Sequence, residues 1–504
     1  MRRRVHAGTT LEREVREGTS GHVARRRVRA VAHAGVIAAI VLLAALIVWP
    51  ALGFPPSIPP FAPDNIDALS LGAFHEPWFF FTHGGAVWRP LTYSTLWAQY
   101  ELGGLDISAF VSFNVLLWVA CASLVYAVVY SQTRLILAAA PAALVMLTDE
   151  RVFSPLVWFI ERQSLLASIF GLLALLIARS LVQQSGRSRV KLAALFLLLL
   201  AAATSKEFGL AFAFGVVTIG VLHPSRRREL IGISVGALVA YGFLRGLAGG
   251  WNFGSGAETN RGFNDASSDL GLCEVMGWGA NPREVCYGEL GLIEQLAQYA
   301  WNIGASFVGI FFSPVIHGNG YLLAPDLLGT TLGGPDWYEG FAVGDIIVPC
   351  IITALAVVAF WKRPKVALPL LAIIAVNAGL DFQYYRPRNV IVGMVALHVA
   401  AGIGIPPTFE IIRRYLRRFE GRPPLWPALT RRGRGLAVIA CVLGLAAILT
   451  SQAGDLSDQL EGAHTGYAER DPCDAAEQYG SEMPNLLKEK YGLPGPCAFS
   501  PAPY

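Results

Sequence analysis

The chain has 504 residues, of which 54% are hydrophobic and only 15% are charged, and its mean hydropathy is +0.47. Soluble domains carry about 25% charged residues, so this composition excludes an ordinary soluble protein and indicates a polytopic membrane protein. The formal net charge of +4 does not indicate a nucleic-acid partner, because the basic residues gather in short clusters beside apolar runs.

The N-terminal segment, residues 1–30, is rich in arginine and precedes the first apolar run, Val31 to Trp49. This run is longer than the apolar core of a signal peptide, and no clear small-residue cleavage site follows it. We therefore expect an uncleaved anchor, with residues 1–30 as a basic segment in the cytoplasm.

Apolar segments recur along the rest of the chain, and about 11 of them approach the roughly 20 residues that a transmembrane helix needs. They are 31–52, 108–131, 134–149, 158–181, 190–205, 207–222, 230–248, 341–361, 365–381, 389–406 and 435–451. We predict an all-α polytopic membrane domain over 31–451, with outer loops at 53–107 and 249–340 and an outer-side C-terminal tail at 452–504. Segment 293–316 is also long enough to span, but the parity of crossings favours an interfacial or re-entrant helix on the outer side.

The loop charges give the orientation of these spans. The loops that the count places inside contain QTR, QQSGRSRVK, HPSRRRE, KRPK and RRYLRRFEGRPPLWPALTRRGR, whereas the outer loops are long and hold most of the acids. This distribution follows the positive-inside rule. We expect a multi-pass protein of the plasma (inner) membrane, with a cytoplasmic N-terminus and a C-terminus outside or in the periplasm.

The cysteines fit this topology. Cys273 and Cys286 share the second outer loop, and Cys473 and Cys497 share the tail. Disulfides persist on the oxidising side of the membrane, so we predict the pairs Cys273–Cys286 and Cys473–Cys497.

Charged residues cluster at the outer ends of the predicted spans, where burial is costly unless function or pairing retains the charge. Five clusters converge on that face. They are Asp64 with Asp67, Arg89 in WRPLT, Glu161 with Arg162 in WFIERQSLLA, Lys206 with Glu207 in ATSKEFGLAF, and Asp381, Arg386 and Arg388 in DFQYYRPRN.

Purely structural explanations of these clusters stay open. Asp64 follows Pro63 and suits a helix N-cap, with Asp67 in the first turn. Lys206 and Glu207 suit a short turn between two helices. The remaining candidates are lipid-headgroup anchors at Arg386 and Arg388, an aromatic belt at residues 78–81, and surface residues at His75 and Glu76.

Taken in order, these clusters give the chain a resemblance to the GT-C superfamily of integral-membrane glycosyltransferases. Within it the chain is most similar to the membrane part of the O-mannosyltransferases that carry tetratricopeptide repeats. The likeness rests on PDNIDAL after the first span, then WRPLT, the Arg before an apolar helix in SPLVWFIERQ, TSKEFGLAF and, more loosely, YYRPRN. The chain departs from the family at Asn65, where a second adjacent acid is usual, and it lacks the repeats.

The resemblance implies a GT-C-like bundle and transfer of a sugar from a polyprenyl-phosphate donor to a hydroxyl acceptor at the outer face of the membrane. Such chemistry needs a carboxylate as general base and cations on the departing phosphate. On this interpretation Asp64 is the base and Asp67 supports it. Arg386, Arg388, Lys206 and Arg89 bind the lipid phosphate, while Glu207, Glu161 and Arg162 are supporting residues.

Two other function classes stay open. A lipid-linked sugar flippase or transporter would favour internal repeats and polar residues near mid-membrane, and neither feature is evident in the sequence. A polysaccharide ligase or polymerase would depend on the outer arginines and not on a carboxylate after the first span. No cofactor is certain; a divalent cation, Mg²⁺ or Mn²⁺, stays open, because two acids with no clear third ligand do not decide it. The expected partners are the polyprenyl-phosphate donor, the bilayer and a hydroxyl acceptor that is a protein, glycolipid or polysaccharide.

Overall fold

The computed structural model describes most of the apolar part of the chain. The described residues are 6–53, 77–82, 88–104, 106–149, 152, 155–156, 158–184, 186, 188–249, 300, 303–304, 306–311, 343–380, 389–419, 443–454, 456–458 and 460–461. All regular secondary structure in these ranges is helical. An all-α protein is therefore confirmed.

The first half of the chain contributes most of the helices. They are α1 (His6–Leu52), α3 (Pro77–Thr82), α4 (Pro90–Gly103), α5 (Ile107–Thr133), α6 (Ile136–Leu147), α8 (Arg162–Gln183), α9 (Arg189–Ser205), α10 (Leu210–Leu222) and α11 (Arg227–Gly249). Short 3₁₀ turns, η2 (Phe159–Glu161), η3 (Glu207–Gly209) and η4 (Pro224–Arg226), precede α8, α10 and α11. The second half adds α17 (Val343–Lys362), α18 (Pro364–Leu380) and α19 (Ile391–Phe419), and residues 443–454 are helical.

Apart from α3 and α4, which lie within the predicted outer loop 53–107, these helices lie at the predicted apolar segments. Their ends differ from the predicted ones by a few residues, except where α1 and α19 run on beyond them. Five stretches in the described part are long and apolar enough to cross a membrane: Ala30–Leu52, Ile107–Thr133, Phe159–Gln183, Pro224–Ala248 and Ile391–Tyr415. A polytopic membrane protein is thus confirmed, while the number of about 11 crossings stays a prediction.

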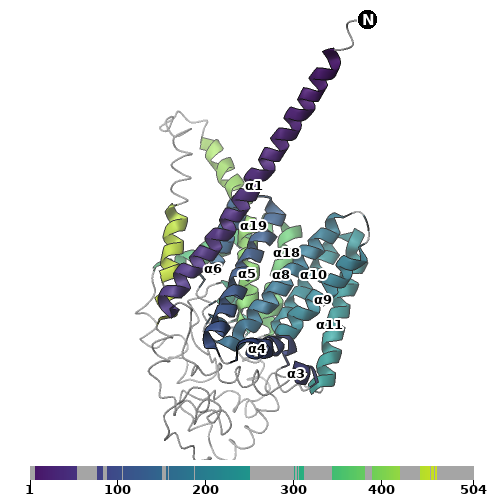
Figure 1. Cartoon of the computed structure of the whole chain (residues 1–504), viewed down its shortest axis with the longest axis vertical. Coiled ribbons are helices and arrows are strands. Elements are labelled where there is room, and N and C mark those ends of the chain that lie inside the picture. Colours follow the sequence, from purple (N-terminus) through teal and green to yellow (C-terminus); the bar gives the residue numbers. More distant parts are fainter. Residues whose placement is uncertain are drawn as a thin grey trace, which may run out of the picture.

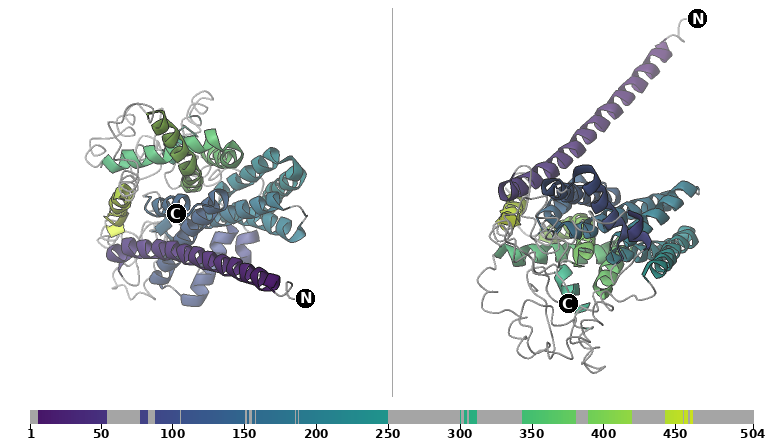
Figure 2. Two further views of the ribbon diagram at one scale, coloured as in Figure 1. Left: turned by 90° about the horizontal axis from the view of Figure 1, so that it is seen from above. Right: turned by 60° about the horizontal axis from the view of Figure 1, so that its bottom comes forward.

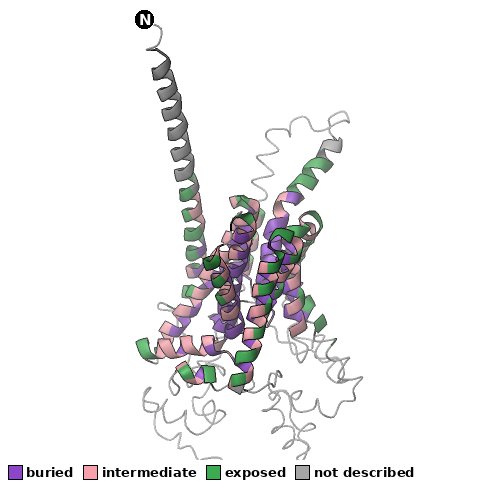
Figure 3. Ribbon diagram, turned by 90° about the vertical axis from the view of Figure 1, so that its right-hand side faces the viewer, coloured by how far each residue is buried: buried purple, intermediate pink, exposed green. Residues whose placement is uncertain are grey.

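The helices form one bundle around a continuous apolar core. α5 packs against α6 and α8, α8 packs against α9, and α10 lies between α11 and α18 (Figure 1). Buried residues such as Trp118 and Phe212 fill the space between helices, and the outward surfaces are more exposed (Figure 3). α1 leans on α5 and α6 through Ile40 and Ile47, and its N-terminal part extends away from the bundle (Figure 2).

The bundle has two ends that differ in chemistry. At the Lys206 end, where α9 finishes and α8 begins, α4 lies across the ends of the longer helices (Figure 1). At the opposite Lys365 end, α8 finishes and α18 begins, about 25 Å away by the helical rise between residues 162 and 179. The loops rich in Arg and Lys join helices at the Lys365 end.

The described part of segment 293–316 packs into the bundle. Ile310 is fully buried and lies against Gly393 near the start of α19. The hydroxyl of Thr353, midway along α17, donates to the carbonyl oxygen of Phe311 at 3.1 Å. Whether this segment is interfacial or re-entrant stays a prediction, but residues 310 and 311 are anchored to two apolar helices.

Candidate active site

Arg89 is positioned at the Lys206 end by the start of α4. It directly precedes Pro90, whose fixed φ suits the first position of a helix. Its Nε donates to Oε2 of Glu207 at 2.8 Å, its Nη2 donates to Oε1 of the same carboxylate, and its Nη1 donates to Oε1 of Gln163 at 2.7 Å. Burial by itself lowers the pKa of Arg89, but the Glu207 carboxylate outweighs it and raises the pKa above its usual value. The guanidinium is therefore a fixed cation held by a two-pronged pair.

A second ion pair lies beside the first. The Lys206 ammonium is 1% exposed and lies 3.1 Å from Oε2 of Glu161. It also donates to the Ser164 hydroxyl at 2.9 Å. The amide of Gln163 joins the two pairs, because it accepts from Arg89 and donates to Oε1 of Glu161 at 3.0 Å. We call these six residues the paired-charge network: Arg89, Glu161, Gln163, Ser164, Lys206 and Glu207.

The turn between α9 and α10 sets the direction of Lys206 and Glu207. α9 ends at Ser205, Lys206 is extended, and Glu207 opens the 3₁₀ turn η3. The turn passes so close to α9 that a Cβ on Gly209 would lie 2.1 Å from the carbonyl oxygen of Ala202. The hydroxyl of Thr92 on α4 donates to the carbonyl oxygen of Ser205 at 2.9 Å, which ties α4 to the same turn.

Arg162 is buried beside the network in a different environment. Its Nε donates to the carbonyl oxygen of Phe159 at 3.0 Å, and its Nη1 donates to Oε1 of Gln99 on α4. The guanidinium carbon lies 5.5 Å and 5.1 Å from the ring centroids of Phe110 and Phe113. Its Nη2 has no hydrogen-bond acceptor within the described ranges. Aromatic faces and neutral acceptors thus solvate this cation.

The sequence analysis missed one acid–histidine pair. Nε2 of His398 on α19 lies 3.4 Å from Oδ2 of Asp149, and both side chains are almost fully buried. Nδ1 of His398 is 3.0 Å from the carbonyl oxygen of Met394, so both ring nitrogens face acceptor oxygens, and the two side chains form an ion pair when the ring is protonated. An acid and a histidine inside apolar segments were the available signal, since ionisable residues are rare there.

No known family model and no curated protein matches the chain by sequence. Among solved structures, the fold matches the archaeal oligosaccharyltransferase AglB from Archaeoglobus fulgidus, solved in complex with an inhibitory peptide and a dolichol-phosphate. The TM-score is 0.50 at 12% identity, and the match covers 94% of this chain and 61% of that one. The chain therefore shares the fold of this oligosaccharyltransferase structure. Two other structures of the Archaeoglobus fulgidus oligosaccharyltransferase, in the apo form and tethered to an acceptor peptide, match at 13% and 14% identity with TM-scores of 0.49 and 0.48.

This fold match supports the GT-C resemblance inferred from the motifs, and closeness to the O-mannosyltransferases stays a prediction. The chain spans about 61% of the length of the AglB structure. Likeness at this level of identity concerns the arrangement of helices, so the reaction has to be argued from this chain's own residues.

The structure brings together the sequence-predicted residues Arg89, Glu161, Lys206 and Glu207, with Arg162 adjacent. Other predicted residues lie outside the described part: Asp64, Asp67, His75, Glu76, Asp381, Arg386, Arg388, Cys273, Cys286, Cys473 and Cys497. The two predicted disulfides therefore stay predictions. Of the described cysteines, Cys121 and Cys350 are free thiols.

The pairing refines the expected roles of Arg89 and Lys206. Both cations were expected to bind a lipid phosphate, yet each is neutralised by a carboxylate, Glu207 and Glu161 respectively. These carboxylate oxygens face cations. Within the described ranges no three His, Cys, Asp or Glu side chains gather as metal ligands do. The described residues thus do not fit a divalent cation.

The aromatic helix α3 lies at the same end. Trp78 is 74% exposed, whereas Phe80 is buried with its ring centroid 5.3 Å from that of Tyr93 on α4. One ring fixes α3 to α4 while Trp78 projects outward, which is the arrangement of an aromatic belt at a membrane surface.

Proposed function

We propose that the chain is a membrane glycosyltransferase that moves a sugar from a polyprenyl-phosphate-linked donor to a hydroxyl acceptor at the outer face of the membrane. The paired-charge network carries this proposal. An apolar bundle gains nothing from charges buried at one end unless they hold a polar site in shape, because desolvating them is costly. The GT-C fold and the order of the motifs support the same conclusion.

The donor class follows from the surroundings of the network. A polyprenyl chain needs apolar helix surface beside the reacting group, and this bundle offers it along its whole length. The AglB structure contains a dolichol-phosphate, which is a polyprenyl phosphate, so a protein of this fold binds such a lipid. A sugar-bearing lipid of this type is the donor that we propose here.

In the proposed reaction the acceptor hydroxyl attacks the anomeric carbon of the sugar. The carbon–oxygen bond to phosphate breaks, the phosphate leaves with the bonding electrons, and the hydroxyl proton passes to a carboxylate. We assign the carboxylate to Asp64, with Asp67 supporting it, and the grip on the departing phosphate to Arg386 and Arg388. An arginine fork matches two phosphate oxygens.

The network has a positioning role in this scheme. Arg89–Glu207 and Lys206–Glu161 are tied to one another through Gln163. They hold α4, η2 and η3 at fixed separations, and the outer loop that contains Asp64 and Asp67 leads into α4. Pre-organisation of this kind keeps reacting groups within hydrogen-bond reach.

The experiment uses detergent extracts of cells that lack the gene, supplemented with purified protein. Solubilised extracts have no two sides, so a flippase becomes unnecessary there, whereas a transferase stays necessary. We expect wild-type protein to restore transfer onto the glycan or glycoprotein that mass spectrometry finds missing. If the extract without added protein already carries out the transfer, the enzyme assignment is overturned in favour of a transporter.

Asp64→Asn tests the base within the same assay. The amide keeps the shape and remains a good helix cap, but it cannot take a proton. If Asp64 is the base, transfer falls by about 10²–10⁴-fold, and Asp67→Asn is milder. Near-normal transfer by Asp64→Asn, with the protein folded, would reduce Asp64 to a helix cap and favour a ligase-type reaction that depends on arginine.

A further inference from the structure

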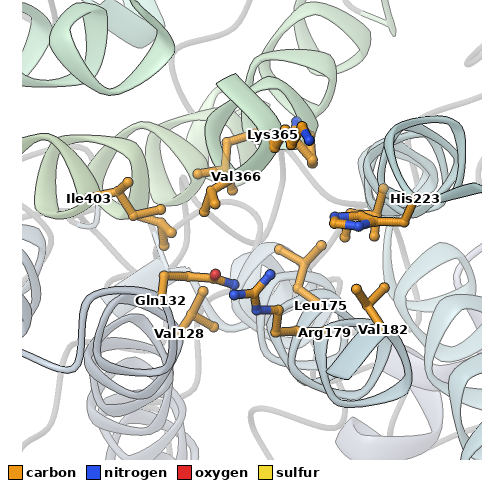
Figure 4. Close-up of a pocket in the computed structure, with 13 residues that line it drawn as sticks. Val128, Gln132, Leu175, Arg179, Val182, His223, Lys365, Val366 and Ile403 are labelled. Atoms are coloured by element: carbon orange, nitrogen blue, oxygen red, sulfur yellow. The ribbon is translucent and has the colours of Figure 1, made fainter. Parts of the chain in front are cut away.

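A pocket opens at the Lys365 end of the bundle, opposite the paired-charge network. It is bounded by α5, α8, α10, α18 and α19, and it encloses about 440 Å³ when the space open to the exterior is included. Its walls are apolar, with residues such as Leu175, Leu370 and Ile403. Four polar side chains also line it: Gln132, Arg179, His223 and Lys365 (Figure 4).

Two polar groups of the pocket lack partners among the described residues. Arg179 and Gln132 point toward one another, with Lys365 and His223 on other helices around them (Figure 4). Nε of Arg179 and Oε1 of Gln132 are buried, and neither has a hydrogen-bond partner in the part of the chain that the structure describes. A buried hydrogen-bond donor without an acceptor costs about 1–3 kcal/mol, so the Nε of Arg179 favours binding of a group that accepts a hydrogen bond.

The described lining of the pocket also lacks a counter-ion, since it contains no Asp or Glu. The loop residues 131–135, 183–191, 223–229 and 361–365 around it contain a single acid, Glu229, which pairs with Arg226 at 2.8 Å. His223 lies outside the spans, and its pKa is lowered first by burial and then by the positive charges of Arg179 and Lys365. The positive charges of Arg179 on α8 and Lys365 on α18 therefore both act on His223.

We propose that this pocket binds the phosphate group of an anionic membrane lipid, held by Arg179 and Lys365. The geometry favours a lipid over a free phosphate ion because the same pocket joins a cationic head to apolar walls. Arg179 provides a planar fork for two phosphate oxygens, Lys365 provides a mobile ammonium, and neutral His223 adds a hydrogen bond. Basic pockets between transmembrane helices bind phospholipid head groups in this way. Binding here is independent of the proposed sugar transfer.

The test measures thermal unfolding of the purified full chain in a neutral detergent while one additive is titrated. The additives are phosphatidylglycerol, phosphatidylcholine and inorganic phosphate. We expect phosphatidylglycerol to raise the Tm in a saturable manner, since a ligand of the folded state stabilises it, and the other two to have little effect. Lys365 is exposed, so Lys365→Gln should leave folding intact. Lys365→Gln and Arg179→Gln should each raise the phosphatidylglycerol concentration at the midpoint of this titration by at least about tenfold.

Arg228→Gln is the matched control, because Arg228 is exposed at the same end and does not line the pocket. It removes the same charge and should leave the midpoint unchanged. Equal weakening by Arg228→Gln and Lys365→Gln would show non-specific attraction to the basic face and overturn the site. An equal rise in Tm with inorganic phosphate would overturn the lipid assignment.

Discussion

Lys206 is a cation that the apolar bundle tolerates because Glu161 and Ser164 face it. The distances of 3.1 Å to the carboxylate and 2.9 Å to the hydroxyl fill two of its three donor positions. The desolvation of such an ion costs several kcal/mol, and its pair offsets this only with good geometry. Because replacement by apolar residues is often neutral or stabilising, retention of the pair points to a role other than stability.

Removal of one partner should therefore be far more harmful than removal of both. Lys206→Met leaves the buried Glu161 carboxylate without its counter-ion, so we expect a loss of about 3–5 kcal/mol of unfolding free energy. The double variant Lys206→Met with Glu161→Gln should recover most of this loss, since the amide introduced at position 161 can still bond to Gln163 and Ser164. Thermal unfolding in detergent measures both.

Lys191→Met serves as the control for this comparison. Lys191 is half-buried and donates to the hydroxyl of Ser180 at 2.6 Å, so its loss leaves no carboxylate unpaired. We expect a change within about 1 kcal/mol. If Lys206→Met is no more harmful than Lys191→Met, the Lys206–Glu161 pair is not desolvated. If the double variant is stable but fails in the transfer assay, the ion pair is required for transfer and not for stability.

At the scale of elements, the turn between α9 and α10 depends on the absence of one side chain. Gly209 has φ −61°, which any residue adopts, so the requirement comes from space and not from backbone conformation. Its position against the carbonyl oxygen of Ala202 lets η3 lie on α9 and directs Lys206 and Glu207 to their partners on other helices.

Gly209→Ala should open this turn. The new Cβ would lie 2.1 Å from a backbone oxygen, which cannot move without α9, and overpacking of this kind costs about 1–3 kcal/mol. Gly232→Ala on α11 is the control, since nothing lies within 4 Å of its Cβ and alanine favours a helix by about 0.5–1 kcal/mol. The two variants should move the Tm in opposite directions, with transfer reduced only in Gly209→Ala. A neutral Gly209→Ala would contradict the close packing of η3.

For the whole molecule, apolar length was enough to predict an all-α membrane protein and the positions of its long apolar helices, but not α3 and α4, which lie in the predicted outer loop 53–107. The motifs also identified four members of the network, yet the pairing scheme was beyond the sequence. Arg89 and Glu207 are 118 residues apart, and no local rule joins them. Asp149 and His398 were hidden because each was counted within an apolar span. The lipid pocket was missed because Arg179, His223 and Lys365 come from helix ends that only folding brings together.

The orientation of the two ends is the prediction on which the functional scheme depends at this scale. Positive-inside reasoning places the Lys365 end in the cytoplasm and the Lys206 end outside. Glu101→Cys at the exposed C-terminal end of α4 and Arg228→Cys at the basic end place one thiol at each end of the bundle. In sealed vesicles with the cytoplasmic side inward, a membrane-impermeant maleimide should label the thiol introduced at position 101 and reach position 228 only after detergent is added. Peptide mass spectrometry identifies the labelled site and separates it from native cysteines such as Cys350, which is the exposed one of the two described cysteines. The reverse labelling pattern would place the paired-charge network on the cytoplasmic side of the membrane. A donor presented at the outer face could then not reach it, and the proposed reaction would have to be assigned to the other side of the membrane.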